Sequence, residues 1–326
     1  MITYIKESDI IKNISMSEMI EVVEKSLIEI SNNNGIFPQR TIIQTPNNNL
    51  ALFMPSFLNM GSISGIKIGT ITPNNVKENK PLINGIIVLI NSLNGEIKAI
   101  LDAAHITALK TGAVSAVATK YLSQKQSENL FIIGTGAQAK TQVKAVCAIR
   151  NINKIFVFSR NEQNRTKFTN WLKNERWCTA KIMNCESIHN AIEFADIICI
   201  ATSTKSEIPI LKNYLFKKFV HINSIGGCSE KACEFSYKLI NKNNIYVEKI
   251  DFAVKESGEI ASAINNNLIN KNDLKEIGSV IGKNQFDPRS NLTVFKSVGL
   301  SALDISVGEY IYNKIISLNQ KGDNFI

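Results

Sequence analysis

The sequence predicts an α/β chain in which a doubly wound parallel sheet is joined to a second, mixed α+β domain. Three observations support this fold class: an apolar run ends at a glycine turn near residue 134, strands alternate with helices after that turn, and hairpin-like strands precede it. Alternating strands and helices are typical of a parallel sheet covered on both faces. We place one domain at residues 1–116, completed by 296–326, and the doubly wound domain at 117–295.

The first domain begins with an amphipathic helix, Met16–Ile30. The Asn-rich segment Thr45–Asn49 and the turn Asn94-Gly95 favour hairpins, so this half could form an antiparallel or mixed sheet. The segment Ser301–Leu318 is apolar at helical spacing and is expected to return to this domain. Strand-like segments lie at Thr41–Gln44, Ala51–Met54, Ser64–Ile68, Ile83–Ile90 and Ile97–Ile100.

The glycine turn follows the strand Leu130–Ile133 and precedes a helix from Gln138 to about Ile149. Gly134 permits a tight turn, Gly136 lets the backbone approach a pyrophosphate, and Ala139 takes the place of the third glycine. The helix would offer free N–H groups and its positive dipole end to the anion. The turn therefore predicts a Rossmann-type domain that binds a dinucleotide.

The alternation continues to the end of this domain and predicts further strands and helices. The sequence predicts strands at Lys154–Phe158, around Ile182, at Ile197–Ala201, at Val220–Asn223 and, last, at Asn244–Val247, with helices from Asn161 to about Lys173 and at Ser187–Phe194.

The composition argues against a membrane-spanning, nucleic-acid-binding or secreted protein. The 326 residues are 44% hydrophobic and can bury a sizeable core, but no apolar run reaches the length of a membrane span. The net charge of +9 is spread over lysines interspersed with Asp and Glu, so nucleic-acid binding is not expected. The N-terminus lacks the pattern of a secretory signal, and the six cysteines show no Cys-x-x-Cys spacing. We expect a cytoplasmic protein with neither a disulfide nor a metal site.

A set of spaced motifs is distributed over nearly the full length of the chain: Pro38–Thr41, Met54–Ser56, Ser64–Gly69, Asn94–Asp102, Ile106–Ala113, Gly134–Ala139, Glu256–Glu259 and Thr293–Gly299. In their order and spacing, these segments resemble the ornithine cyclodeaminase/mu-crystallin family. The resemblance implies a homodimer in which the first domain and the C-terminal helix bind substrate and pair the subunits, and it implies chemistry on amino acids or cyclic imines.

Three cations stand at family positions: Arg40, Lys67 and Lys110. Chemistry on an amino or imino acid needs cations for the carboxylate and a group that transfers a proton near the carbon that exchanges hydride. Arg40 can grip a carboxylate at two points. Lys67, within an apolar strand, could have a lowered pKa and act as the acid or base at the substrate nitrogen. Each could instead be a solvated surface charge.

Two positions depart from the family pattern. Lys110 stands where the family usually has Arg, which keeps the charge but loses the bidentate fork. Cys228 follows Gly226-Gly227, where ornithine cyclodeaminases place a catalytic aspartate, and a thiol lacks the fixed charge of that group at neutral pH. Cys228 could contact substrate, act as a nucleophile or be inert. His221, within the preceding strand, is expected to pack there.

Cofactor preference can be judged at the end of the strand Lys154–Phe158, where an NAD enzyme normally has an acidic side chain. This chain has Ser159, Arg160 and Asn161, with Arg165 one helical turn further. These cations favour NADP over NAD, although Arg160 could merely stack on adenine.

The resulting prediction is an NAD(P)-dependent oxidoreductase that acts on the CH–NH bond of a small amino acid or its imine. One alternative is an ornithine cyclodeaminase-type lyase that makes proline and ammonia with bound NAD, and another is a non-catalytic protein that binds a small ligand. We expect Lys67 to be catalytic and Arg40, Lys67, Lys110 and Cys228 to bind substrate. The expected cofactor contacts are Thr111, Gly134, Thr135, Gly136, Ala137, Gln138, Ser159, Arg160, Thr202 and Ser297.

Overall fold

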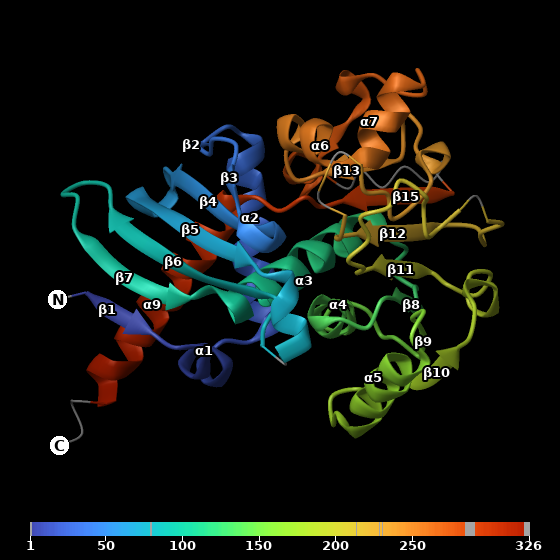
Figure 1. Ribbon diagram of the computed structural model, residues 1–326, viewed down its shortest axis with the longest axis horizontal. Coiled ribbons are helices and arrows are strands. Elements are labelled where there is room, and N and C mark those ends of the chain that lie inside the picture. The colour runs from blue at the N-terminus through green and yellow to red at the C-terminus, as the bar shows by residue number, and fades with distance from the viewer. Residues whose placement is uncertain are drawn as a thin grey trace. The chain divides into compact units, whose positions relative to one another are not determined.

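The computed structural model describes residues 2–78, 80–212, 214–227, 229, 231–283 and 291–322 (Figure 1). The chain forms two compact units, one of Met1–Lys110 with Leu300–Ile326 and the other of Thr111–Gly299. Helix α3, Ala103–Leu122, runs across this division. None of the described helices is long and apolar enough to cross a membrane.

The first unit is built on a mixed sheet with the strand order β1-β7-β6-β5-β4-β2, and β3 pairs with β4. All pairs are antiparallel except β1 with β7. The β3–β4 hairpin turns at Asn47 and Asn48, both with positive φ, as its Asn-rich sequence predicts. The strands are β1 (Thr3–Ile5), β2 (Gly35–Ile36), β3 (Thr41–Thr45), β4 (Asn49–Leu58), β5 (Ile63–Ile71), β6 (Ile83–Asn91) and β7 (Ile97–Asp102).

Three helices accompany this sheet: α1 (Glu7–Asn13), α2 (Met16–Ser31) and α9 (Ser301–Gly322). Helix α9 packs on β4, β5 and β6 as well as on α2, so the C-terminal helix does return to the first unit. Ser15 caps α2 through its hydroxyl and starts a capping box with Glu18. The Ser26 and Ser306 hydroxyls meet at 2.8 Å between α2 and α9.

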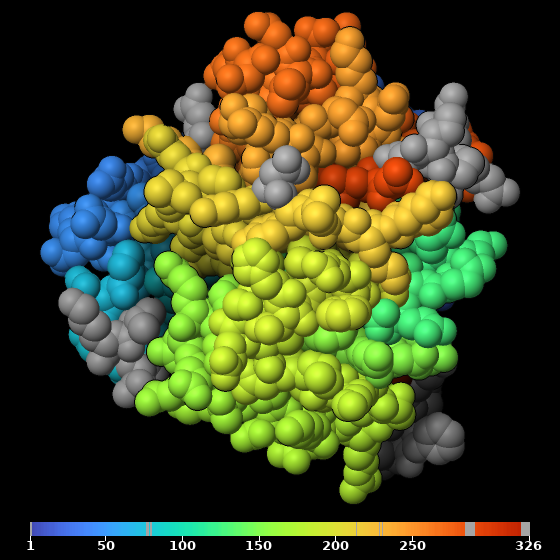
Figure 2. All heavy atoms as spheres, turned by 90° about the vertical axis from the view of Figure 1, so that its right-hand side faces the viewer, coloured from blue at the N-terminus to red at the C-terminus, as the bar shows by residue number. Residues whose placement is uncertain are grey.

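The second unit is an eight-stranded, all-parallel sheet with the order β10-β9-β8-β11-β12-β15-β13-β14. The order reverses between β8 and β11, which is the topological switch point of a doubly wound sheet. The predicted fold class is thus confirmed. Figure 2 shows the space-filled face formed mainly by its later segments, coloured yellow-green to orange. Its strands are β8 (Asn129–Ile133), β9 (Lys154–Phe158), β10 (Lys181–Cys185), β11 (Ile197–Ile200), β12 (Val220–Ser224), β13 (Ile245–Val247), β14 (Lys275–Glu276) and β15 (Leu292–Lys296).

Two expectations for this unit were wrong. The segment predicted as a helix at 187–194 has only a 3-10 turn, Ile188–Asn190, although a capping box of Ser187 and Asn190 starts it. Strand β13 is not the last: β14 and β15 follow it, and β15 lies between β12 and β13. The helices are α4 (Ala137–Cys147), α5 (Glu162–Asn174), α6 (Ile250–Glu256), α7 (Gly258–Asn265) and α8 (Ile277–Val280).

Candidate functional site

Gly134 follows β8 directly and has φ of 104°. Its N–H donates to the Phe158 carbonyl at 2.9 Å, which joins the ends of β8 and β9. A Cβ at this position would lie 2.3 Å from the Ala201 carbonyl oxygen, at the end of β11. Both the backbone conformation and this contact therefore require glycine at the switch point.

Gly136 is the N-cap of α4, and a Cβ built there meets nothing within 4 Å. No side chain caps the helix, and Ala139 is fully buried one turn further. The Gln138 Oε1 atom is buried and has no hydrogen-bond partner among the described residues. Open space, free helix N–H groups and an orphaned polar atom fit a pyrophosphate at Thr135, Gly136 and Ala137.

At the end of β9, the structure agrees with the sequence prediction for one of the two expected cations and differs for the other. Arg160 is exposed, and Asn161 caps α5 by accepting the Asn164 N–H at 2.9 Å. Arg165, however, is buried: it donates to the Ser159 carbonyl at 3.0 Å and to the Asn184 side chain. Arg165 is therefore not the exposed second cation that a 2′-phosphate would need, because its guanidinium is buried and donates to Ser159 and Asn184.

The other expected cofactor contacts lie beyond strand ends or on α3. The Thr202 hydroxyl follows β11 and donates to Glu234 at 2.7 Å, and the Ser297 hydroxyl follows β15 and donates to Glu248 at 3.0 Å. The Thr111 carbonyl on α3 accepts the Gln142 side-chain N–H at 3.2 Å. The sequence resemblance matched Glu234 to a glutamate of the family, but not to the aspartate missing at Cys228. It gave no role to Glu248, which lies outside the glycine turn.

In the first unit, Lys67 and Lys110 converge on one carboxylate. Their Nζ atoms lie 3.0 Å and 3.5 Å from the two oxygens of Asp304, which is 0% exposed. Lys67 lies on β5, Lys110 on α3 and Asp304 on α9, so three elements build this cluster. Sequence reasoning missed Asp304; the available signal was an acidic residue on the apolar face of the C-terminal helix.

Arg40 interacts electrostatically with Lys67 of the same cluster. Burial lowers the pKa of Lys67; the charges of Lys110 and Arg40 lower it further, and Asp304 opposes them. Burial alone would raise the pKa of Asp304, but Lys110 and Lys67 hold it below its usual value. Two lysines thus share one buried carboxylate, which leaves an excess of positive charge for an anionic ligand, and the charge of Arg40 acts on Lys67.

The remaining residues singled out in the sequence are Cys228, His221 and the other cysteines. Cys228 lies outside the described residues, so the structure does not place it. His221 is fully buried between Thr293 and Asn223, as expected for a packed residue, and burial lowers its pKa to about 3. The described cysteines 147, 178, 185, 199 and 233 are free thiols.

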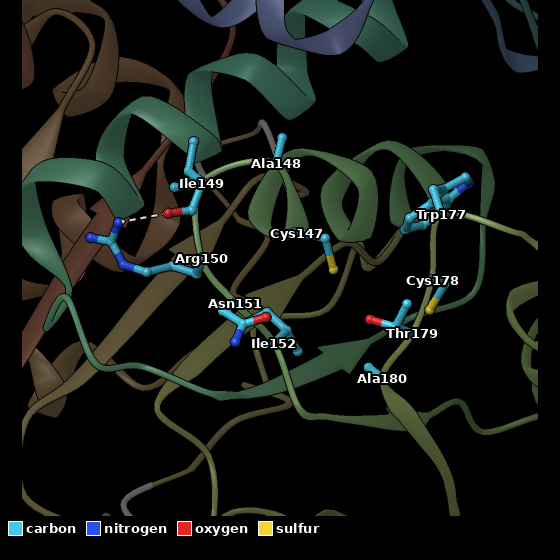
Figure 3. Close-up of a pocket in the computed structure, with 10 residues that line it drawn as sticks. All are labelled: Cys147, Ala148, Ile149, Arg150, Asn151, Ile152, Trp177, Cys178, Thr179 and Ala180. Carbon is cyan, nitrogen blue, oxygen red and sulfur yellow. Dashed lines mark hydrogen bonds between the residues drawn. The ribbon is translucent and has the colours of Figure 1, made fainter.

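A surface pocket of about 360 Å³ lies in the loops that lead into β9 and β10, at the edge of the sheet opposite Gly134 (Figure 3). Cys147 and Cys178 line it, and burial raises the pKa of both thiols, that of Cys147 to about 12. Arg150 points away from the thiols toward the Ile149 carbonyl. None of the expected cofactor or substrate residues lines this pocket.

A doubly wound sheet with a glycine turn at its switch point, joined to a unit with a buried cationic cluster, fits an NAD(P)-dependent oxidoreductase. The family comparison is more specific: the model of the ornithine cyclodeaminase/mu-crystallin family matches residues 3–319. The chain belongs to this family.

Individual relatives agree with this placement. A Δ(1)-pyrroline-2-carboxylate reductase of Bacillus cereus is 35% identical over 310 residues, which cover 94% of each chain. The Thermococcus litoralis Δ(1)-pyrroline-2-carboxylate reductase, solved with NADH and L-proline, is 33% identical with a TM-score of 0.90 over 98% of each chain. An archaeal alanine dehydrogenase dimer with bound NAD is 25% identical with a TM-score of 0.87, over 98% of this chain and 97% of its own. The chain is thus an oxidoreductase acting on the CH–NH bond of a small amino acid or its imine.

Proposed function

We propose that this enzyme reduces a cyclic 2-imino acid, Δ(1)-pyrroline-2-carboxylate, to L-proline. The observation that carries the proposal is the cationic cluster, in which Lys67 and Lys110 share Asp304 while the charge of Arg40 acts on Lys67. A substrate with a carboxylate beside a C=N bond matches both the excess positive charge and a proton donor. The names of the Bacillus and Thermococcus relatives support this substrate.

Arg40 and Lys110 would hold the carboxylate. Arg40 offers a planar fork with two parallel N–H donors, and Lys110 contributes a point charge held in place by Asp304. With Lys110 in place of arginine, only Arg40 can make a bidentate contact, so we expect Arg40 to fix the orientation of the carboxylate plane.

Lys67 would supply the proton. Reduction adds a hydride to the imine carbon and a proton to its nitrogen, and NAD(P)H supplies the hydride when bound. Burial and the two neighbouring cations lower the pKa of Lys67, which makes its ammonium a stronger acid, while Asp304 at 3.0 Å raises that pKa and so opposes loss of the proton before the reaction. Solvent returns the proton to Lys67 afterwards.

The test is cofactor oxidation by purified protein, followed by the absorbance of reduced nicotinamide. The panel contains Δ(1)-pyrroline-2-carboxylate, its six-membered homologue, and pyruvate with ammonia. Preferential turnover of the cyclic imines supports the proposal. Turnover of pyruvate and ammonia alone would replace it with an alanine dehydrogenase activity, and proline formed from ornithine without net cofactor turnover would replace it with the lyase.

We propose further that NADP is preferred over NAD. No acidic side chain occupies positions 159–161, and Arg160 is exposed beside the end of β9. Because Arg165 donates to Ser159 and Asn184, the proposed preference for NADP depends on Arg160. Arg160→Asp should then shift the ratio of kcat/KM values toward NAD, and an unchanged ratio would leave Arg160 without a role in selectivity.

We also propose a homodimer formed through one face of the mixed sheet. The register places Phe53, Ile68 and Ile86 side by side, and Ile66 beside Val88, all half-exposed on this face. A broad apolar sheet face is typical of a subunit interface, and a second copy would cover it by two-fold pairing. Ile68→Lys should yield monomers in sedimentation equilibrium, whereas Ile11→Lys, on exposed α1, should not; a monomeric wild-type protein would contradict the proposal.

A further inference from the structure

Glu234 joins the ends of two neighbouring strands in the second unit. Its Oε1 atom accepts the N–H of Thr202 at 3.0 Å and the Thr202 hydroxyl at 2.7 Å, just beyond β11. Its Oε2 atom accepts the Ser224 hydroxyl at 2.7 Å and the N–H of Gly226 at 2.8 Å, where β12 ends. One carboxylate thus receives four donors from both segments.

Two further buried charges fix this carboxylate. The Lys296 Nζ atom donates to the Gly226 carbonyl at 2.5 Å and to the Ser224 hydroxyl at 3.1 Å, and it lies 3.8 Å from Glu234. Glu259 accepts the backbone N–H of Glu234 at 2.7 Å and lies 3.5 Å from Lys296. All three charged side chains are 0% exposed. Gly226 is therefore held through both its N–H and its carbonyl group.

The two strand ends are in direct contact. A Cβ on Gly226 would lie 2.0 Å from the Thr202 carbonyl oxygen and 2.5 Å from the Glu234 carboxylate. A shift of Glu234 would therefore move both segments together, since neither has free space beside the other.

The network also determines whether the Thr202 hydroxyl can act as a hydrogen-bond donor or as an acceptor toward a ligand. A hydroxyl has one hydrogen, and that of Thr202 points to Glu234 at 2.7 Å. Its lone pairs remain for a ligand, so half-buried Thr202 presents an acceptor and not a donor. In a doubly wound sheet the second group of strands binds the second mononucleotide. The carboxamide of a nicotinamide ring carries N–H donors that match such an acceptor.

We propose that Glu234 is a positioning residue for the nicotinamide end of the cofactor: it fixes the backbone at Thr202 and Gly226 and presents the Thr202 hydroxyl as an acceptor to the carboxamide. This inference rests on the proposed placement of the dinucleotide at the carboxyl edge of the second unit. Lys296 and Glu259 hold Glu234 in the required orientation.

The experiment compares two ligands by titration calorimetry: NADPH and 2′-phospho-ADP-ribose, which lacks the nicotinamide ring. Glu234→Gln should raise the Kd of NADPH about tenfold or more and change that of the fragment less than about twofold, because an acceptor oxygen is replaced by an amide N–H group only at the nicotinamide end. The matched control is Asp196→Asn. Asp196 likewise accepts two backbone N–H groups, at 3.0 Å and 2.9 Å, but at the opposite edge of the sheet, so the ratio of Kd values should not change.

Equal weakening of both ligands, or an unchanged ratio, would overturn the inference. If Glu234→Gln does not fold, Thr202→Val provides the second test: it should lose the preference for NADPH over its 3-acetylpyridine analogue, whereas Thr204→Val should keep it. A retained preference in Thr202→Val overturns the proposal. A wild-type protein that binds no nicotinamide nucleotide would instead remove the cofactor placement itself.

Discussion

Replacing Asp304 with asparagine tests the electrostatics of the substrate site most directly. The change keeps the shape of the side chain but removes the carboxylate that both Lys67 and Lys110 contact, at 3.0 Å and 3.5 Å. Breaking a buried ion pair by removing one partner costs about 3–5 kcal/mol, because the remaining charges stay buried without compensation. In this site, Lys67 and Lys110 would lose the buried carboxylate that they share.

The predicted result is a shift of the pH profile. Asp304 raises the pKa of Lys67 against the effects of burial and neighbouring cations. An opposite charge at this range changes a pKa by about 1–3 units, so the pKa of Lys67 should fall by a similar amount in Asp304→Asn. If protonated Lys67 is the acid, activity is lost as pH rises through its pKa. The basic limb of kcat/KM should therefore move down by about 1–3 pH units.

The assay is steady-state imine reduction over a range of pH, with Glu309→Gln as the control. Glu309 lies on the same helix and is half-buried, but its interacting cation is Lys98 rather than Lys67. The control should keep the wild-type limb. A basic limb at the same pH in Asp304→Asn and wild type would refute the assignment of Lys67 as the acid that Asp304 controls.

Three further predictions concern the two units separately. Lys67→Met should reduce imine reduction by at least about a hundredfold and leave the Kd of NADPH within a few-fold, and normal turnover would exclude Lys67 as the proton donor. Gly134→Ala should lower the melting temperature, because its Cβ meets the Ala201 carbonyl at 2.3 Å, whereas Gly136→Ala should keep that temperature but weaken nucleotide binding. Equal melting temperatures for the two variants would contradict this reasoning. His221 has a folded pKa of about 3, below the unfolded value of 6.5, so its contribution to stability is present above pH 6.5 and is lost as pH falls toward 3. In urea unfolding between pH 7 and 5, His221→Gln should show a shallower loss of stability, by up to about 1.4 kcal/mol per pH unit toward the acid end, and an unchanged slope would show that His221 is protonated in the folded state.

Local chemistry explains which features the sequence could predict. The glycine turn was predictable because Gly134, Gly136 and Ala139 are close in the chain and each has its own backbone requirement. The hairpins at Asn47 and Gly95 follow from residues that accept positive φ. Helix α2 was predictable as well, since its apolar periodicity and its Ser15 cap are both local.

Features that depend on distant residues were not predictable in the same way. Asp304 is 237 residues from Lys67 and 194 from Lys110, so no spacing in the sequence shows that they share a carboxylate. Arg165 is buried against Asn184, which lies on β10, 19 residues further along the chain. The sequence alone suggested a phosphate ligand at this position, whereas the structure shows a packed residue. Strand β15 was missed because its neighbours in the sheet, β12 and β13, both precede it in the chain.

The position of β15 has a consequence for biosynthesis. In the described part of the sheet, β13 and β14 are joined to the other five strands only through β15, which begins at Leu292. Until this segment leaves the ribosome, β12 and β13 each expose an unpaired edge, and such edges are prone to associate with other chains. Helix α9, which carries Asp304, is synthesised directly afterwards. Both units therefore depend on the final tenth of the chain for completion, so a truncated product would fail to assemble the dinucleotide sheet and the cationic cluster together.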